Sequence, residues 1–245
     1  MEMILLDWTR MGKTYCLAGA VFEKATVRVV RPLSSKYRQA SVRNVGWSPW
    51  LLDGHTRWEV FELIGPEPAS PEPPHLEDVW VRALRPRRSL AAPEQRRAIL
   101  IATMPKSGED LFGTSLQTAR VAAFMEPGSG QRSLVTVSVP ANKICFAASR
   151  REGAPEVDVR VTVPLPGLGE RTLPVKDHHL LRRAEAAGSP EVLLKVLTTT
   201  VQTMGDSVAV RLGLSRGFQG GARSTSQCWL MADGFFSLEN PQPQK

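Results

Sequence analysis

The chain has 245 residues, with 42% hydrophobic and 22% charged residues, which is typical of a folded protein rather than a disordered one. No stretch approaches the roughly 18 uninterrupted apolar residues of a membrane-spanning helix, and the N-terminus lacks the basic and apolar pattern of a secretion signal. The sequence therefore predicts a soluble cytoplasmic protein with no membrane partner.

The formal net charge is +7, and arginine supplies most of the positive charge. An excess of this size favours a polyanionic partner, because phosphates attract it and release counterions on contact. A general compositional bias toward arginine produces the same excess without any selection for binding. Charge alone therefore leaves both explanations open.

Three cysteines, Cys16, Cys145 and Cys228, are too few and too widely spaced for a disulfide framework or a zinc knuckle. Each lies in or next to an apolar run. They are predicted to be small buried hydrophobic residues of a protein in a reducing compartment.

Short strands dominate the first third of the chain. They are predicted at residues 3–8, 15–22, 25–31, 58–64 and 77–83. Residues 34–56 lack clean periodicity and are predicted to be a long connection. The segment GPEPASPEPPH (65–75) is too rich in proline for a central strand, so it is predicted to be a linker or an ordered sheet edge.

A basic segment, RALRPRRS (82–89), follows, and Pro93 then favours a helix over 94–104. Residues 105–132 are predicted to be mostly loop. The basic and helical connection is taken to span 85–130.

The second half shows a clearer strand pattern. Strands are predicted at 133–139, 143–149 and 157–163, and in the last of these valines alternate with polar residues. Asp177 is predicted to cap a helix over 178–187, and Pro190 begins a second helix with an apolar stripe. Strands return at 207–214 and 227–237.

Three strands, a helix and two strands form the element order of a five-stranded OB barrel, and the first half can also be divided into five strands. The predicted fold class is mainly β, with two tandem OB-like small barrels at 1–84 and 131–245, joined by the connector 85–130. A single β-sandwich and an unrelated α+β fold are the alternatives.

Several motifs resemble the dual OB-containing domain family of bacterial conflict-associated proteins. The opening strands match its [ST]-R-x-G, C-x-A-G and x-x-R-P elements at Thr9, Arg10, Gly12, Cys16, Ala18, Gly19, Arg31 and Pro32. Further matches are HLEDVWV (75–81), LFG (111–113), LPVKDHHLLRRA (173–184), LGLSRGF (212–218) and WLMADGFFSL (229–238). Lys176 and Gly217 depart from the family pattern, which usually has Thr and Pro there.

The resemblance covers nearly the whole chain and implies two OB barrels that recognise nucleic acid, with no established catalysis. It also implies a role as a sensor or accessory subunit in a bacterial defence or mobile-element system. Nucleic acid, with single-stranded DNA or RNA favoured, is the expected partner, and other protein subunits of a defence complex are further candidates.

OB barrels bind oligonucleotides by combining cations with stacking aromatic side chains. The candidate contacts are Arg10, Lys13, Arg28, Arg31, Arg85, Arg87, Arg88, Arg211, Arg216 and Phe218. Arg211 is expected to point outward, because its neighbours in the strand are apolar. Trp8 or Tyr15 would offer a base platform, although Trp8 also fits a core position. The alternative is that the cations are merely solvated or pair with Asp7, Glu23 and Glu59.

The adjacent pair His178 and His179 does not indicate a metal site, because neighbouring helix positions diverge by about 100° and zinc needs further ligands. No pattern for nucleophilic or acid–base catalysis stands out. A non-catalytic protein without metal or cofactor is therefore predicted. The alternatives are a structural adaptor that binds proteins, or an enzyme with an unrecognised site.

Overall fold

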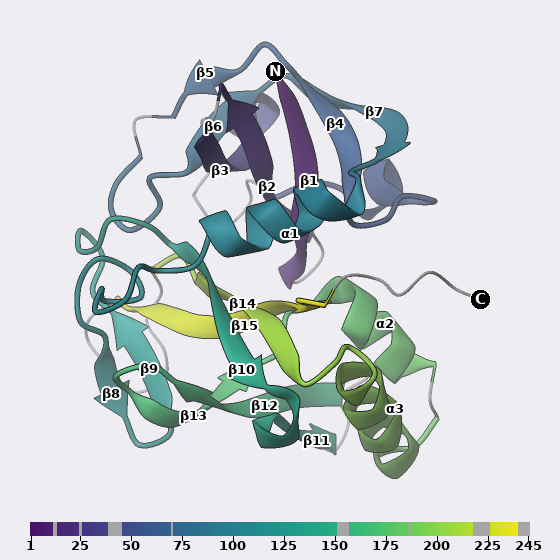
Figure 1. The fold of residues 1–245 in the computed structure, drawn as a ribbon. Helices are drawn as coiled ribbons and strands as arrows, with labels where there is room; N and C mark the ends of the chain where they lie inside the picture. The colour runs from purple at the N-terminus through teal and green to yellow at the C-terminus, as the bar shows by residue number, and fades with distance from the viewer. Residues whose placement is uncertain are drawn as a thin grey trace.

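Strands form about half of the described chain in the computed structural model and helices much less, which confirms a mainly β fold. The structure describes residues 1–11, 14–24, 26–38, 46–69, 71–150, 157–186, 188–217 and 226–239. Two curled sheet systems lie one above the other, and α1 (Pro93–Ala102) lies across the first of them (Figure 1). No helix in these ranges is both long enough and apolar enough to cross a membrane.

The first curled sheet closes on itself through one bent strand. Its strands are β1 (Glu2–Met11), β2 (Thr14–Glu23), β3 (Thr26–Ser34), β4 (Glu59–Ile64), β5 (Glu67–Pro68), β6 (Asp78–Val81) and β7 (Ala83–Leu90). β1, β2 and β3 form a meander, and β4 pairs with the free edge of β1. β6 pairs in parallel with β3, whereas β7 pairs with β4. Only Arg82 separates β6 from β7, so the two act as one bent strand. This bent strand pairs with β3 at one end and β4 at the other, and it thereby closes the sheet into a barrel.

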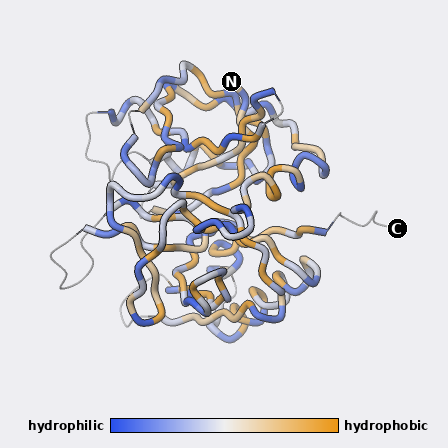
Figure 2. Tube along the Cα trace, turned by 60° about the vertical axis from the view of Figure 1, so that its left-hand side comes forward, coloured by the Kyte–Doolittle hydropathy of each residue, from blue (hydrophilic) through white to orange (hydrophobic). Residues whose placement is uncertain are grey.

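Side-chain alternation gives the first barrel an inside and an outside. Met3 and Leu5 point into its core with Phe61, whereas Ile4 and Leu6 point outward and pack with Ala20, Ala91 and Ile99 beneath α1. A bulge between Leu5 and Asp7 shifts the register of β1 against β2. Figure 2 shows the apolar segments concentrated inside the molecule.

The second curled system consists of a five-stranded sheet and a three-stranded sheet. Its elements are β8 (Gln117–Ala119), β9 (Ala122–Met125), β10 (Leu134–Pro140), η4 (Ala141–Lys143), β11 (Cys145–Arg150), β12 (Val157–Leu165), β13 (Gly169–Pro174), α2 (His178–Glu185), α3 (Pro190–Gln202), β14 (Ser207–Leu214) and β15 (Cys228–Ser237). The five-stranded sheet has the order β10-β14-β15-β9-β8, and the three-stranded sheet has the order β11-β12-β13. β10 pairs with β14, and β11 pairs with β12, which pairs with β13. β14 pairs with β15, and a parallel bridge from Val175 to Ala232 connects the end of β13 to β15.

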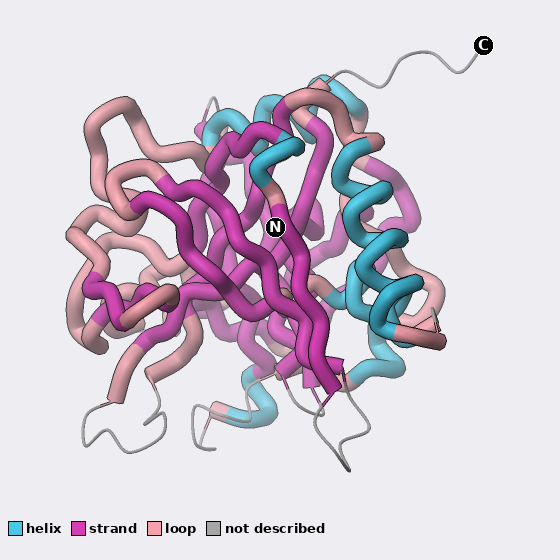
Figure 3. Tube along the Cα trace, turned by 90° about the horizontal axis from the view of Figure 1, so that it is seen from below, coloured by secondary structure: helices cyan, strands magenta, loops and turns pink. Residues whose placement is uncertain are grey.

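From β10 onward, and with β10 and β11 counted as one bent strand around η4, the second unit has three strands, two helices and two strands. The helices follow β13, which is one strand later than the predicted strand 157–163. Figure 3 shows α2 and α3 on one side of the strands and most of the loops on the opposite side.

Three segments differ from their predicted structure. Ala83–Leu90 is a strand that pairs with β4, although its arginines and proline suggested a connector. Gln117–Ala119 and Ala122–Met125 form a hairpin in a region predicted to be loop. Gly169–Pro174 is a third strand beside β12 that the sequence reading missed. In each case pairing with a neighbouring strand overrides a weak local pattern.

The cysteine prediction is wrong in part. Cys228 is buried and Cys16 is half-buried, but Cys145 is exposed because it points to the outer face of β11.

The beginning of α3 provides a test of local stability. Ser189 accepts a hydrogen bond at Oγ from the backbone N of Val192 at 3.4 Å, and Pro190 follows at the first helical position. We expect Ser189→Ala to lower the free energy of unfolding by about 1 kcal/mol in urea denaturation, because an N-cap acceptor is lost. Thr199→Ala, on an exposed position of the same helix, should not destabilise, since alanine is the better helix former. Equal losses in the two variants would contradict the capping role.

Candidate functional site

Charged side chains are buried where the two barrels meet. The part of the outer face of β1 and β2 that carries Asp7, Thr9 and Cys16 lies against β14 and β15 of the second barrel. Buried polar residues at or near this junction are Asp7, Thr9, Arg31, His75, Asp78, Ser133, Thr136, Asp177, Arg211 and Asp233. Buried ions are costly unless they are paired, so their partners determine what this junction can do.

Arg211 on β14 and Asp7 on β1 form a completely buried ion pair. Arg211 Nε donates to Asp7 Oδ1 at 3.0 Å, and Nη2 donates to Oδ2 at 2.5 Å. The remaining terminal nitrogen, Nη1, donates to Thr136 Oγ1 at 3.1 Å. This bidentate geometry fixes one barrel against the other.

A second cluster shares one carboxylate between two arginines. Arg31 Nη1 lies 3.3 Å from Asp78 Oδ1, and Arg216 Nη1 lies 2.7 Å from Asp78 Oδ2. Arg31 Nη2 also donates to Ser133 Oγ at 2.7 Å. Glu77 stabilises the same junction by accepting from the Ser133 backbone N at 2.7 Å and from the Ser133 hydroxyl at 2.9 Å.

His75 is a neutral member of this cluster. Burial, followed by the charges of Arg31 and Arg216, lowers the pKa of His75 to about 2. Its Nδ1 therefore accepts a hydrogen bond from Arg31 Nη1, at a distance of 2.8 Å. An imidazole with this pKa stays uncharged throughout the physiological pH range.

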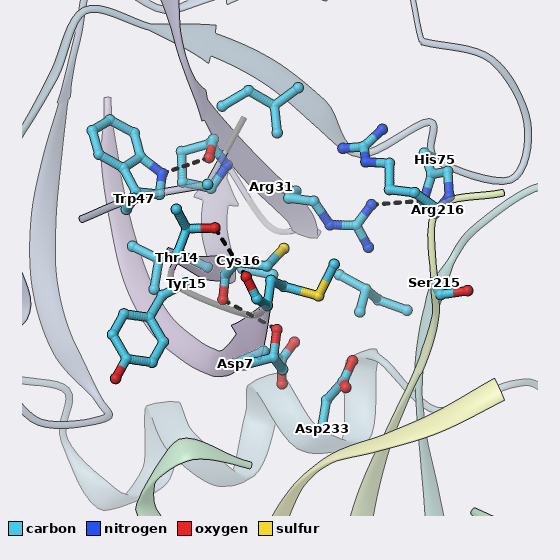
Figure 4. A pocket seen from close by; sticks show the side chains of 18 of the residues that line it. Asp7, Thr14, Tyr15, Cys16, Arg31, Trp47, His75, Ser215, Arg216 and Asp233 are labelled. Atoms are coloured by element: carbon cyan, nitrogen blue, oxygen red, sulfur yellow. Dashed lines mark hydrogen bonds between the residues drawn. The ribbon is translucent and has the colours of Figure 1, made fainter. Parts of the chain in front are cut away.

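A pocket of about 50 Å³ opens between these groups (Figure 4). Arg31 extends into it, with Arg216 and His75 beside its guanidinium and Asp233 on the opposite side. Apolar and aromatic walls come from Tyr15, Leu17, Leu33, Trp47, Leu134, Leu214 and Met231. The junction thus combines an apolar cavity with converging charged groups, which is the usual composition of a small-ligand site.

Two further groups in the pocket have perturbed pKa values. Burial, reinforced by the charge of Asp7, raises the pKa of Asp233 to about 8, so this carboxyl is mostly protonated at neutral pH. Burial also raises the pKa of the Cys16 thiol, which keeps it protonated and poorly nucleophilic.

Two predicted nucleic-acid contacts are not on the surface. Arg211 was expected to point outward, and this is wrong, because its side chain is fully buried against Asp7. The prediction failed because the outer face of β14 is covered by the first barrel instead of by solvent. Arg31 is likewise buried and paired with Asp78, so it cannot contact a nucleic-acid backbone on the surface.

The more exposed candidates pair with carboxylates. Arg28 pairs with Glu23 at 2.7 Å, Arg10 with Glu185, and both Arg85 and Arg87 with Glu62, at 3.2 and 2.9 Å. Exposed pairs of this kind contribute little, so these cations can still exchange partners. Lys13, Phe218 and the side chain of Arg88 lie outside the described residues.

Of the aromatic candidates, Trp8 and Tyr15 belong to the core. Trp8 is buried and stacks on His178, with ring centroids 4.4 Å apart, and Tyr15 meets the same imidazole edge-on. This confirms the core interpretation of Trp8 and contradicts the base-platform interpretation.

Asp177 caps α2 as predicted, accepting at Oδ1 from the backbone N of Leu180 at 3.1 Å. It also pairs with Arg57 at 2.7 Å. Within the described ranges no group of three or more His, Cys, Asp or Glu side chains could hold a metal ion.

Sequence reasoning named Asp7 only as an alternative partner of the cations and missed Asp233 at the junction. Asp7 and Asp233 each interrupt a strongly apolar strand, ILLDW and LMADGFF. A carboxylate inside such a run signals a buried partner or a raised pKa, and this signal was available in the sequence.

No protein-family model and no curated protein matches the chain. A solved structure of a murine DNA-binding protein bound to double-stranded DNA is similar over 100% of this chain and 98% of that chain. The sequence identity is 9% and the TM-score 0.32, so this likeness carries no argument about function.

Proposed function

We propose that the protein is a non-catalytic nucleic-acid-binding protein built from two OB-like barrels, acting as a sensor or accessory subunit of a bacterial defence or mobile-element system. The strand order of both barrels and the net charge of +7 support this proposal. The resemblance of its motifs to the dual OB-containing family supplies the biological context.

The proposal depends on one surface that stays open. OB barrels bind oligonucleotides on the outer face of their second and third strands. In the first barrel this face is covered partly by α1, over Ala20 and Val27, and partly by the second barrel, where Cys16 and Arg31 line the small pocket. In the second barrel the corresponding face of β11, β12 and β13 is accessible, with Cys145, Ala147 and Arg160 exposed.

The registers place the relevant side chains of this open face together. Ala147 lies opposite Arg160, and Thr162 lies opposite both Cys145 and Thr172. Small and hydroxyl side chains allow a nucleic-acid backbone to approach the sheet closely. Arg160 would supply a phosphate contact, since its pairing with Asp158 at 3.1 Å is exposed and readily exchanged.

The test is fluorescence anisotropy with labelled single-stranded DNA, single-stranded RNA and double-stranded DNA over a salt series. We expect log K to fall linearly with log salt, with a slope of about −0.7 to −0.9 for each phosphate contacted. Arg160→Glu should weaken binding about tenfold at low salt, because it replaces a phosphate contact with a repulsive charge.

Arg97→Glu is the matched control, because Arg97 is exposed on α1, beside the first barrel, and the change in net charge is the same. It should retain nearly all the affinity at moderate salt. Binding that is absent for all three nucleic acids, or equal losses in both variants, would overturn the proposal. Salt-independent capture of a protein instead would favour an adaptor role.

A further inference from the structure

We propose that the pocket between the barrels is a specific site for a small oxyanion, a phosphate or carboxylate group, held by Arg31 and Arg216. This inference does not depend on the proposed nucleic-acid function. It uses a different face of the molecule and different residues.

Unsatisfied hydrogen-bond donors are the first support. Within the described residues, neither Arg31 Nε nor Arg216 Nη2 has a hydrogen-bond partner, although both atoms are buried. Both residues line the pocket. Buried polar atoms are almost always paired in native proteins, so something that enters this space must accept these hydrogen bonds.

Charge is the second support. Around the pocket the guanidinium groups of Arg31, Arg211 and Arg216 face the carboxylates of Asp7, Asp78 and Glu77, so the wider cluster is balanced. The wall of the pocket itself is different, because Arg31 and Arg216 line it with Asp7, whereas Asp233 is mostly protonated and His75 is neutral. The two guanidinium groups on this wall therefore favour an anionic group in the pocket.

Size and walls are the third support. A volume of about 50 Å³ exceeds the roughly 10–15 Å³ that one water molecule requires, and it suits a group of several heavy atoms. Apolar walls around Arg31 and Arg216 lower the local dielectric and strengthen their attraction for an anion. Guanidinium groups also match the planar or tetrahedral oxygens of carboxylate and phosphate.

The direct test is isothermal titration of the full chain with phosphate, sulfate and acetate at constant ionic strength. We expect saturable binding, weakened about tenfold or more in Arg216→Gln, since a charge-assisted hydrogen bond is lost. Arg97→Gln should bind like the unaltered protein. An absence of saturable heat would show that water alone fills the pocket, and equal binding by Arg216→Gln would show that the anion binds elsewhere. Either result would overturn the proposal.

A pH series keeps the proposal testable even if Arg216→Gln folds poorly. Asp233 is faced by Asp7, Asp177, Arg31 and Arg211, and its pKa is about 8. Its ionisation places a negative charge beside the bound oxyanion. Affinity for sulfate, whose own charge is constant in this range, should fall about tenfold from pH 7 to pH 9. Asp233→Asn should bind equally at both values, and an unaltered protein without pH dependence would contradict the site.

A further titration distinguishes whether the oxyanion is the end of a nucleic-acid strand or a free small anion. A dinucleotide with a 5′-phosphate and one with a 5′-hydroxyl are titrated beside inorganic phosphate. Preference for the 5′-phosphate dinucleotide over inorganic phosphate identifies a strand terminus, whereas binding of the inorganic ion alone identifies a free small anion. If neither the 5′-phosphate dinucleotide nor inorganic phosphate binds, the proposal of an oxyanion site is wrong. The proposal that nucleic acid binds the open face of β11–β13 would not be affected by this result.

Discussion

Replacing Arg211 with alanine should lower the free energy of unfolding by about 3–5 kcal/mol, because the variant leaves the Asp7 carboxylate buried without its partner. Thr136 Oγ1 would also lose the donor that lies 3.1 Å away. Chemical denaturation at pH 7 measures the effect. Arg97→Ala, which removes an exposed arginine, should change stability by less than about 0.5 kcal/mol.

A double variant separates the loss of pairing from the loss of packing. Asp7→Leu combined with Arg211→Met removes both charges and fills the same space with apolar atoms. We expect it to recover most of the lost stability, since apolar replacements of buried ion pairs are often neutral or stabilising. A loss below about 1 kcal/mol in the single variant would mean that water reaches Asp7 and that the junction is not tight.

The stability of the protein should fall as the pH rises above neutrality, and Asp233→Asn should abolish this loss. The folded pKa of Asp233 is about 8, against an ordinary value of 3.8. Between these values the folded state holds a proton that the unfolded state has lost, so stability declines as pH increases. Integration from pH 6.5 to pH 9 gives a loss of about 2 kcal/mol.

The histidines act in the opposite direction at lower pH. Burial lowers the pKa of His75 to about 2 and that of His178 and His179 to about 4, so their contribution to stability is lost as pH falls below 6.5. The raised thiol pKa of Cys16 adds to the destabilisation only near and above pH 9. Denaturation curves from pH 6.5 to pH 9 therefore isolate Asp233, and parallel profiles for the unaltered protein and Asp233→Asn would refute the assignment.

The repeating apolar patterns made the strands and helices predictable. The alternation in β12 and the apolar stripe of α3 gave both elements within a few residues, because burial of one face fixes the period of the sequence. β7 was missed, since Pro86 and its arginines conceal the pairing with β4. Pairing between strands distant in sequence has no local signature.

The site was less predictable for the same reason. Arg211 alternates correctly with its apolar neighbours, and the sequence indicates only that it occupies the other face of β14. Whether that face meets solvent or a second barrel is a property of tertiary packing. The local hint was the pair of acids in β1 and β15, whose apolar surroundings require a cation from elsewhere in the chain, as for Asp7, or a raised pKa, as for Asp233.

Because ion pairs cross the junction, neither half is expected to be an independent folding unit. If the first half were expressed alone, Asp7 and Asp78 would lose their partners Arg211 and Arg216. If the second half were expressed alone, these two arginines would lack their carboxylates. Unfolding should accordingly proceed in a single cooperative transition, and circular permutation or fission between the halves should be poorly tolerated.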